Sequence, residues 1–338
     1  MASMIKIGLR FFKVGRECLQ RAGQMGVHGG TIRFNLIPGV LEQGRPDAEG
    51  VRRLKQAFAS FGLELGGMEL SRSLITGVLR GEQDRAAQEL DRLTETIRLI
   101  GGEGLGLVTC GFSVAHADEG EHPWRGYIDE PGGQAGTLRR TFDAALLTND
   151  DLVTWGKPDP RRPGVLVTRA EVFRRMDGFM EHVLPVARAA GVRLAFHPND
   201  PPMPLYRGVE QPFVNPEGLA ELLRRYDDPH VGLLFCMGTM HESGADMPAA
   251  LRRFGEQGKI SCLHFRNVRG TIPRFHEVFP DEGDYDPVAQ IRTLHAVGYD
   301  GYLMPDHYPG LTGDTTAHDM AVAWTVGYFR ALIQATKP

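Results

Sequence analysis

The sequence predicts an α/β protein in which eight parallel strands, each followed by a helix, close into a (β/α)8 barrel over residues 1–338. Short apolar runs alternate with longer amphipathic runs along most of the chain, and eight such strand-then-helix units can be counted. No glycine-rich GxGxxG turn follows the first strand, which argues against a dinucleotide-binding fold. We therefore expect one barrel domain.

Each unit follows from its residue pattern. The expected strands are short apolar runs at residues 5–12, 29–36, 63–70, 103–112, 192–198, 230–238, 259–268 and 299–308. The expected helices have apolar residues at helical spacing and cover residues 15–23, 47–62, 84–101, 170–191, 217–227, 247–258, 286–298 and 319–336.

One stretch interrupts this alternation after the fourth strand. Residues 113–167 are rich in Gly, Pro and charged residues, and only "TLRRTFDAALL" (residues 137–147) is typical of an ordered segment. A long insertion of this kind forms a lid, an oligomer contact or a disordered segment, and its composition leaves these alternatives open. It follows a strand end on the face where a barrel carries its active site.

Composition excludes several classes of function. With 42% hydrophobic and 24% charged residues and a net charge of -4, the chain resembles a globular protein without a nucleic-acid or membrane partner. The opening "MASMIKIGLR" lacks the apolar run of a signal peptide, so a cytoplasmic location is expected. The four cysteines form no CxxC pair, which argues against zinc-finger and thioredoxin-like sites.

Four polar residues stand at the ends of four successive strands. The fifth strand ends with His197 in "AFHPNDPP", the sixth with Cys236, the seventh with His264 and the eighth with Asp306. In a barrel these strand ends surround one cavity, so the four side chains should converge there. Two imidazoles, a thiolate and a carboxylate are a suitable ligand set for a divalent transition metal.

Further candidates lie near the same rim. Arg266 follows His264 by two residues and should share its face, where a guanidinium can hold a substrate carboxylate. His307 stands at a strand end and can act as an acid or a base. Glu69 ends the third strand and could contact a substrate hydroxyl or belong to a buried network. The segment "RFHE", which contains His276, is a weaker candidate for substrate binding.

Taken together, "AFHPNDPP", "FCMG", "LHFRNV", "FHE", "GDYD" and "MPDH" resemble, in order and spacing, the mannonate dehydratase family of xylose-isomerase-like TIM barrels. The resemblance extends from about Val186 to the C-terminus and is looser before it. It implies that the four strand-end residues bind Mn²⁺ or a similar ion, with Fe²⁺, Co²⁺ and Zn²⁺ also compatible. It further implies that His307 transfers protons and that Arg266 holds the sugar acid.

The implied reaction eliminates water from D-mannonate and gives 2-keto-3-deoxy-D-gluconate. Removing the proton next to a carboxylate builds negative charge that a metal can stabilise, and the departing 3-hydroxyl needs a proton. This chain differs from the family pattern at three positions. Asn199 replaces an acidic residue near the substrate, Met304 replaces an arginine, and His318 stands near the place of a tyrosine and could take over its catalytic role.

These differences keep two other functions open. An isomerase or epimerase of the same barrel class would act on a different sugar and conserve its mass. A barrel that binds a sugar or a metal without turnover would give no product. In each case we expect a small-molecule ligand and a homo-oligomer, because sugar-processing barrels often assemble.

Overall fold

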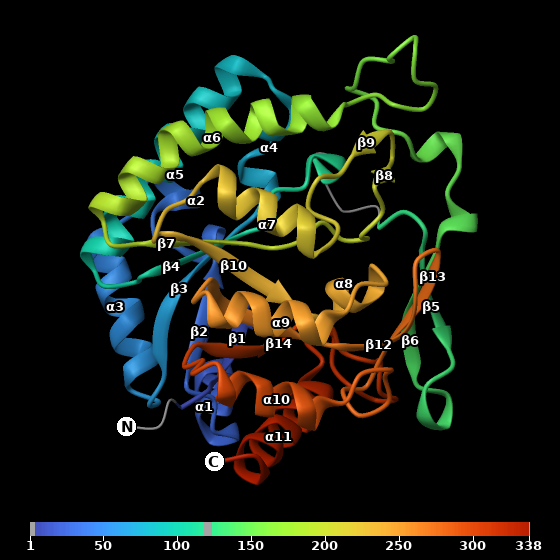
Figure 1. The fold of residues 1–338 in the computed structure, drawn as a ribbon. Helices are drawn as coiled ribbons and strands as arrows, with labels where there is room; N and C mark the ends of the chain where they lie inside the picture. The colour runs from blue at the N-terminus through green and yellow to red at the C-terminus, as the bar shows by residue number, and fades with distance from the viewer. Residues whose placement is uncertain (1–3, 118–123, 338) are drawn as a thin grey trace.

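Eight parallel strands close into a barrel in the computed structural model, which describes residues 4–117 and 124–337 (Figure 1). Around the barrel the strands follow the order β1-β14-β11-β10-β7-β4-β3-β2. Their bounds are β1 Lys6–Phe11, β2 Gly29–Arg33, β3 Glu64–Leu70, β4 Leu107–Cys110, β7 Arg193–Phe196, β10 Val231–Cys236, β11 Ile260–Phe265 and β14 Tyr302–Pro305. The predicted (β/α)8 barrel with an insertion after the fourth strand is confirmed.

A helix follows each barrel strand and packs on the outside. These helices are α1 Arg16–Met25, α3 Ala48–Ala59, α5 Gln83–Gly102, α6 Arg169–Ala189, α7 Pro216–Arg225, α9 Met247–Glu256, α10 Pro287–Ala296 and α11 Asp319–Ala335. Three short helices lie in the connections, α2 Val40–Gln43, α4 Thr76–Arg80 and α8 Met237–Glu242. Within the described residues, no helix is long and apolar enough to cross a membrane.

Local sequence fixes where several helices begin. The side chain of Asn215 accepts a hydrogen bond from the amide of Gly218, and Asp286 accepts one from Val288, at 2.9 and 2.8 Å. A proline follows each of these caps, and its fixed backbone angle suits the first helical position. Both helix starts therefore follow from residues that are adjacent in the sequence.

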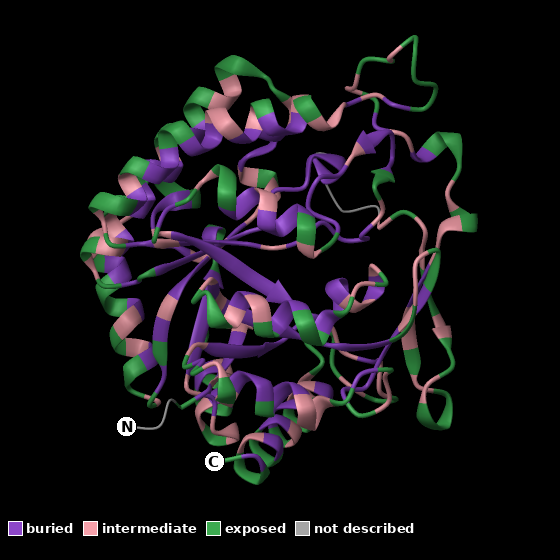
Figure 2. Cartoon of the chain, in the orientation of Figure 1, coloured by how far each residue is buried: buried purple, intermediate pink, exposed green. Residues whose placement is uncertain are grey.

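Side-chain alternation along the strands creates two apolar layers. The larger one lies between the barrel strands and the helices, and Figure 2 shows the barrel strands mostly buried while the outer faces of the helices are exposed. A smaller cluster fills the inside of the barrel and consists of Leu107, Ala195, Leu234, Cys262, Tyr302 and Met304. Met304, one of the three positions at which the sequence differs from the pattern it resembles, therefore lies fully buried in the barrel interior.

A second sheet lies beside the carboxyl ends of the barrel strands (Figure 1). It has the antiparallel order β12-β13-β6-β5, with β12 Asn267–Thr271, β13 Arg274–Val278, β6 Leu138–Asp143 and β5 Tyr127–Pro131. A two-stranded sheet of β8 Leu205–Tyr206 and β9 Val209–Glu210 lies nearby. The insertion thus joins the hairpin that follows β11.

This sheet differs from the sequence expectation in two ways. The expected seventh strand, residues 259–268, is two strands, because β11 ends at Phe265 and β12 begins at Asn267 in a different sheet. In the insertion, order extends beyond residues 137–147 to include β5, since β5 pairs along its length with β6. Residues 118–123 of the insertion lie outside the described residues.

Candidate metal centre and active site

The barrel interior leads directly to the candidate metal centre. Ala195, Leu234, Cys262 and Met304 point inward, and the residue two positions after each must point inward as well. Those residues form the group that we call the ligand cluster: His197, Cys236, His264 and Asp306. The apolar layer is thus the floor of the site, and the ligand cluster lies immediately above it.

The ligand cluster has the dimensions of a metal site. One donor atom from each of its four residues lies within 4.8 Å of all the others. His264 Nδ1 is 3.3 Å from Asp306 Oδ1, and Cys236 Sγ is 3.7 Å from Asp306 Oδ2. Such short separations bring two nitrogens, a sulfur and an oxygen around one point.

Both histidines are prepared to act as neutral ligands. Burial lowers the pKa of His197, and burial lowers the pKa of His264 to about 3. His197 Nδ1 lies 2.7 Å from the carbonyl oxygen of Pro198, an arrangement that places the proton on Nδ1 and leaves Nε2 as a lone pair. The Nδ1 atom of His264 is buried without a hydrogen-bond partner, as an unused ligand atom would be.

The thiol of Cys236 and the carboxyl group of Asp306 are both buried, but their surroundings affect their ionisation differently. Burial raises the pKa of Cys236, so a nearby cation is required to hold it as a thiolate. The amide and the hydroxyl of Thr239, at the start of α8, both lie within 3.5 Å of its sulfur. Burial opposes ionisation of Asp306, yet the surrounding cationic groups, including Arg266 and Arg10, hold its pKa well below the usual value. The donor set therefore fits a divalent transition metal.

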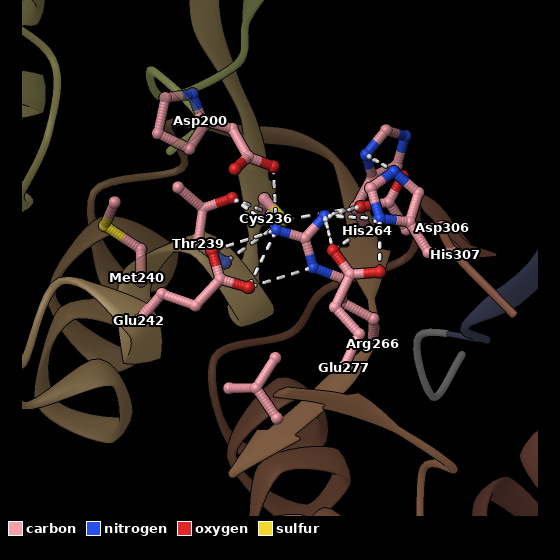
Figure 3. Close-up of polar contacts among 12 residues, drawn as sticks. Asp200, Cys236, Thr239, Met240, Glu242, His264, Arg266, Glu277, Asp306 and His307 are labelled. Atoms are coloured by element: carbon pink, nitrogen blue, oxygen red, sulfur yellow. Dashed lines mark hydrogen bonds and ion pairs between the residues drawn. The ribbon is translucent and has the colours of Figure 1, made fainter. Parts of the chain in front are cut away.

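Arg266 lies at the centre of a buried network beside the ligand cluster (Figure 3). Its side chain is 1% exposed, and its nitrogens donate to Asp200 at 2.8 Å, to Glu242 at 2.9 Å and to Asp306 at 2.8 Å. Gly238 makes room for this side chain, because a Cβ atom there would lie 2.4 Å from Cγ of Arg266. The guanidinium is thus already surrounded by carboxyl groups of the protein, and the substrate contact expected from the sequence stays a prediction.

The carboxylates of this network differ in their ionisation. Burial opposes the charge of Asp200, but Arg266 and other contacts lower its pKa, and the hydroxyl of Tyr127 also donates to it at 2.6 Å. Glu242 is fully buried, and burial raises its pKa well above the usual value despite Arg266. We call Arg266, Asp200, Glu242 and Asp306 the Arg266 network.

His307 lies at the open side of this network. Its Nδ1 is 2.8 Å from both carboxylate oxygens of Glu277 on β13 and 3.1 Å from a guanidinium nitrogen of Arg266. Because the carboxylate is nearer and can only accept, we place the proton on Nδ1, directed to Glu277. The Nε2 atom is 3.7 Å from Asp306 Oδ1, and the side chain is 23% exposed. The ring of Trp124 meets that of His307 edge-on, with 6.3 Å between their centres. A carboxylate-held imidazole at this position can exchange a proton with a bound molecule.

Glu69 lies within the electrostatic neighbourhood of the ligand cluster. Arg10 donates to both of its carboxylate oxygens at 2.8 Å, and the same guanidinium donates to Asp306 at 3.0 Å. Burial opposes ionisation of Glu69, but the charge and hydrogen bonds of Arg10 lower its pKa to about 2. Its side chain remains 22% exposed, so both alternatives from the sequence remain consistent with its position.

Three other candidates occupy different environments. Asn199 is 2% exposed and bonds to the backbone, with Oδ1 accepting from Phe213 N and Nδ2 donating to Phe112 O. His276 lies on β13 and contacts Thr141 at 2.8 Å. The structure therefore gives Asn199 a bridging role between loops and places His276 within the second sheet.

His318 is exposed at the start of α11, and its ring stacks on that of Tyr308 with 6.0 Å between centres. Tyr308 interacts electrostatically with Arg10 and Asp306, and burial raises its pKa. A phenol that interacts with the ligand cluster thus stands two residues after Asp306, at a position that the sequence analysis passed over.

Several residues of the site were missed because they have no motif of their own. Arg10 could have been found, since it is an inward position at the end of β1. Asp200 lies inside the quoted "AFHPNDPP" run. Tyr127 and Trp124 lie in the insertion, and Glu242 lies in a short helix. In such segments the spacing of apolar residues does not predict which distant residues a side chain will contact.

Comparison with known proteins finds similarity to mannonate dehydratases, both in a family model and in individual sequences. The sequence model of D-mannonate dehydratase (UxuA) matches residues 165–337, just over half of the chain. Mannonate dehydratase 2 of Halalkalibacterium halodurans is 34% identical over 145 residues, which cover 42% of each protein. Mannonate dehydratase of Enterococcus faecalis is 26% identical over 318 residues, or 85% of each protein. The chain thus spans about two fifths of the length of the first of these relatives.

Solved structures extend the likeness to the whole fold. The crystal structure of mannonate dehydratase from Streptococcus suis serotype 2 superposes with a TM-score of 0.78 at 22% identity, covering 99% of this chain and 94% of that one. A xylose isomerase domain protein from Planctomyces limnophilus gives a TM-score of 0.61 at 12% identity, covering 99% of each chain. At these identities the likeness establishes a xylose-isomerase-like barrel.

Proposed function

Because this chain belongs to the D-mannonate dehydratase family, we propose that it is a metal-dependent hydro-lyase that converts D-mannonate to 2-keto-3-deoxy-D-gluconate and water. The observation that carries this proposal is the ligand cluster, whose four donor atoms lie within 4.8 Å of one another above the barrel floor. A cluster of this kind at the carboxyl ends of strands is where such a barrel performs its chemistry.

The ligand cluster, His197, Cys236, His264 and Asp306, would hold the metal. When bound, a divalent ion supplies Lewis-acid stabilisation of the negative charge that builds on the substrate as the proton next to its carboxylate is removed. Mn²⁺ is the ion we propose, and Fe²⁺, Co²⁺ and Zn²⁺ suit the same donors. Arg10 and Arg266 orient the carboxylate of Asp306 from two sides.

His307 is the group that we assign to proton transfer. Glu277 holds the proton of Nδ1, so that Nε2 can accept the proton next to the substrate carboxylate. Glu277 stabilises the imidazolium that forms, and Nε2 then delivers the same proton to the departing 3-hydroxyl. That hydroxyl then leaves as water while the C3–O bond breaks, and the enol product gains a proton to become the 2-keto acid. Glu69, at the rim, is placed to accept a hydrogen bond from a sugar hydroxyl.

Arg266 acts in this proposal as a positioning residue, because its guanidinium already contacts three carboxylates of the protein. His318 lies exposed at the start of α11 and stacks on the ring of Tyr308, which interacts electrostatically with Asp306. We therefore assign the hydrogen-bond donor on this side of the site to Tyr308, whose raised pKa keeps its hydroxyl protonated at neutral pH.

The test is mass-resolved product analysis of purified, Mn²⁺-loaded protein incubated with D-mannonate, beside a His197→Ala control. A product lighter by one water, formed by the wild type alone, would support the proposal. A product of unchanged mass would favour the isomerase or epimerase alternative. Absence of product in a metal-loaded protein that D-mannonate stabilises against heat would favour the non-catalytic binding barrel.

The same family context leads us to propose that the second sheet and its insertion cover the active site. Tyr127 of β5 donates to Asp200, and Trp124 contacts the ring of His307, so residues of the insertion touch the site.

We also propose a homo-oligomer, because Met320 and Trp324 lie one turn apart on α11 and are 44% and 39% exposed. Light scattering of the purified protein tests the oligomer.

A further inference from the structure

The arginines around the site differ in whether a carboxylate of the protein already neutralises them. Arg10 is bound by Glu69 through two hydrogen bonds and by Asp306 through a third. Arg266 is bound by the carboxylates of its own network. Among the described residues, Arg72 has no carboxylate within ion-pair distance, although it lies at the same rim.

The backbone places Arg72 at the active-site face. It is the first residue of a short 3-10 helix, Arg72–Leu74, which begins two residues after the end of β3. Its guanidinium carbon lies 5.5 Å from the centre of the Trp124 ring, within the range of a cation–π contact. The same indole meets the ring of His307, so Arg72 and the proposed proton-transfer residue flank one aromatic side chain.

The two carboxylates that act most strongly on Arg72 form no ion pair with it. Glu69 and Asp200 both contribute to its electrostatic environment, but Glu69 is held by Arg10, and Asp200 is held by Arg266. Burial lowers the pKa of Arg72, as expected for a partly desolvated cation without a bonded anion. A guanidinium in this state gains more from an incoming carboxylate than one that is already paired.

We infer that Arg72 binds the carboxylate of the sugar acid, with Trp124 supporting its guanidinium from one side. This assignment rests on the proposed function and adds to it the residue that selects an acid over a neutral sugar. The planar guanidinium offers parallel N–H groups to a carboxylate, and contact with the indole leaves those edge groups directed away from the ring. The substrate would then lie with its acid group on the β3 side of His307.

The test compares Arg72→Gln with Arg140→Gln in the metal-loaded protein. Arg140 is a matched control, because it also lies over the Trp124 ring, at 5.9 Å, but pairs with Asp129 at 3.5 Å. Kinetics with D-mannonate give kcat and KM. Calorimetric titration gives dissociation constants for D-gluconate and D-sorbitol, which share a carbon skeleton and differ in the carboxylate.

We expect Arg72→Gln to raise KM for D-mannonate and Kd for D-gluconate by about 10- to 100-fold, as for loss of a charge-assisted hydrogen bond. Binding of D-sorbitol should not change, and Arg140→Gln should alter each constant by no more than about twofold. Arg72→Lys keeps the charge and the fold and should recover part of the affinity.

Unchanged acid binding in Arg72→Gln would overturn the assignment, as would equal weakening of D-sorbitol or an equal effect of Arg140→Gln. The two proposals can fail separately. If the wild type forms no product but binds D-gluconate more tightly than D-sorbitol through Arg72, the assignment stands and the dehydration does not. If dehydration proceeds with unaltered KM in Arg72→Gln, the reverse holds.

Discussion

Replacing Arg266 by methionine should destabilise the protein far more than replacing an exposed arginine that has equally good contacts. The side chain of Arg266 is 1% exposed, and its partners Asp200, Glu242 and Asp306 are at most 7% exposed. Methionine has a similar length and no charge. The variant therefore keeps most of the packing but leaves buried carboxylates without their cation.

The magnitude follows from these contacts. Removing one partner of a buried ion pair costs about 3–5 kcal/mol, because the remaining charge stays desolvated. Asp306 retains Arg10, and burial raises the pKa of Glu242, so the main loss falls on the carboxylate of Asp200. With about 2.1 cal/mol/K of unfolding entropy per residue, a chain of this length loses roughly 1.4 °C of Tm per kcal/mol. The expected decrease in Tm is therefore roughly 4–7 °C.

The decrease should depend on pH in a defined direction. Without Arg266, burial raises the folded-state pKa of Asp200 above its unfolded value near 4. A carboxyl group whose pKa is higher in the folded than in the unfolded state destabilises the folded protein fully at pH values above its folded-state pKa. This destabilisation decreases as the pH falls, and it disappears below the unfolded-state pKa. The difference in Tm between wild type and variant should therefore narrow between pH 8 and pH 5.

Thermal unfolding followed by circular dichroism at several pH values measures both effects. The control is Arg225→Met, because Arg225 donates two hydrogen bonds to Asp177 but is 42% exposed. That substitution should cost no more than about 1 kcal/mol. Equal Tm values for the two variants at neutral pH, or a difference that widens on acidification, would refute the reasoning about the Arg266 network.

Three further predictions concern the ligand cluster, proton transfer and packing. His197→Ala should lose most of the metal bound by the wild type, as measured by elemental analysis of the purified protein, and retention of the full metal content would contradict the proposed ligand set. Glu277→Gln should lower kcat by about 10- to 100-fold with KM changed much less, because the histidine it holds loses its fixed proton; an effect on KM alone would argue against this role. Gly238→Ala should cost about 1–3 kcal/mol in the free energy of unfolding, since its Cβ would meet the immobilised side chain of Arg266. Gly178→Ala, in open space on α6, is the control and should not destabilise the helix.

Much of the fold could be predicted because its signals are local. Apolar periodicity separates strands from helices over a few residues, and the caps at Asn215 and Asp286 fix helix starts within three positions. The second sheet was missed for the opposite reason. Its strand β6 pairs with β13, more than a hundred positions away, and nothing near Leu138–Asp143 in the sequence specifies that partner.

The candidate site likewise has a part that local sequence predicts and a part that depends on contacts between distant segments. By itself, the sequence determined that four potential metal ligands stand at the ends of four neighbouring strands: His197, Cys236, His264 and Asp306. Side chains two positions apart in a strand share a face, so each ligand points to the same side as the floor residue two positions before it. Only the tertiary structure decided what surrounds them. Arg10 reaches Asp306 across 296 positions, and Arg266 lies among carboxylates from separate loops. Which charges become neighbours depends on how distant segments pack, and that packing determines whether an arginine is available to a substrate.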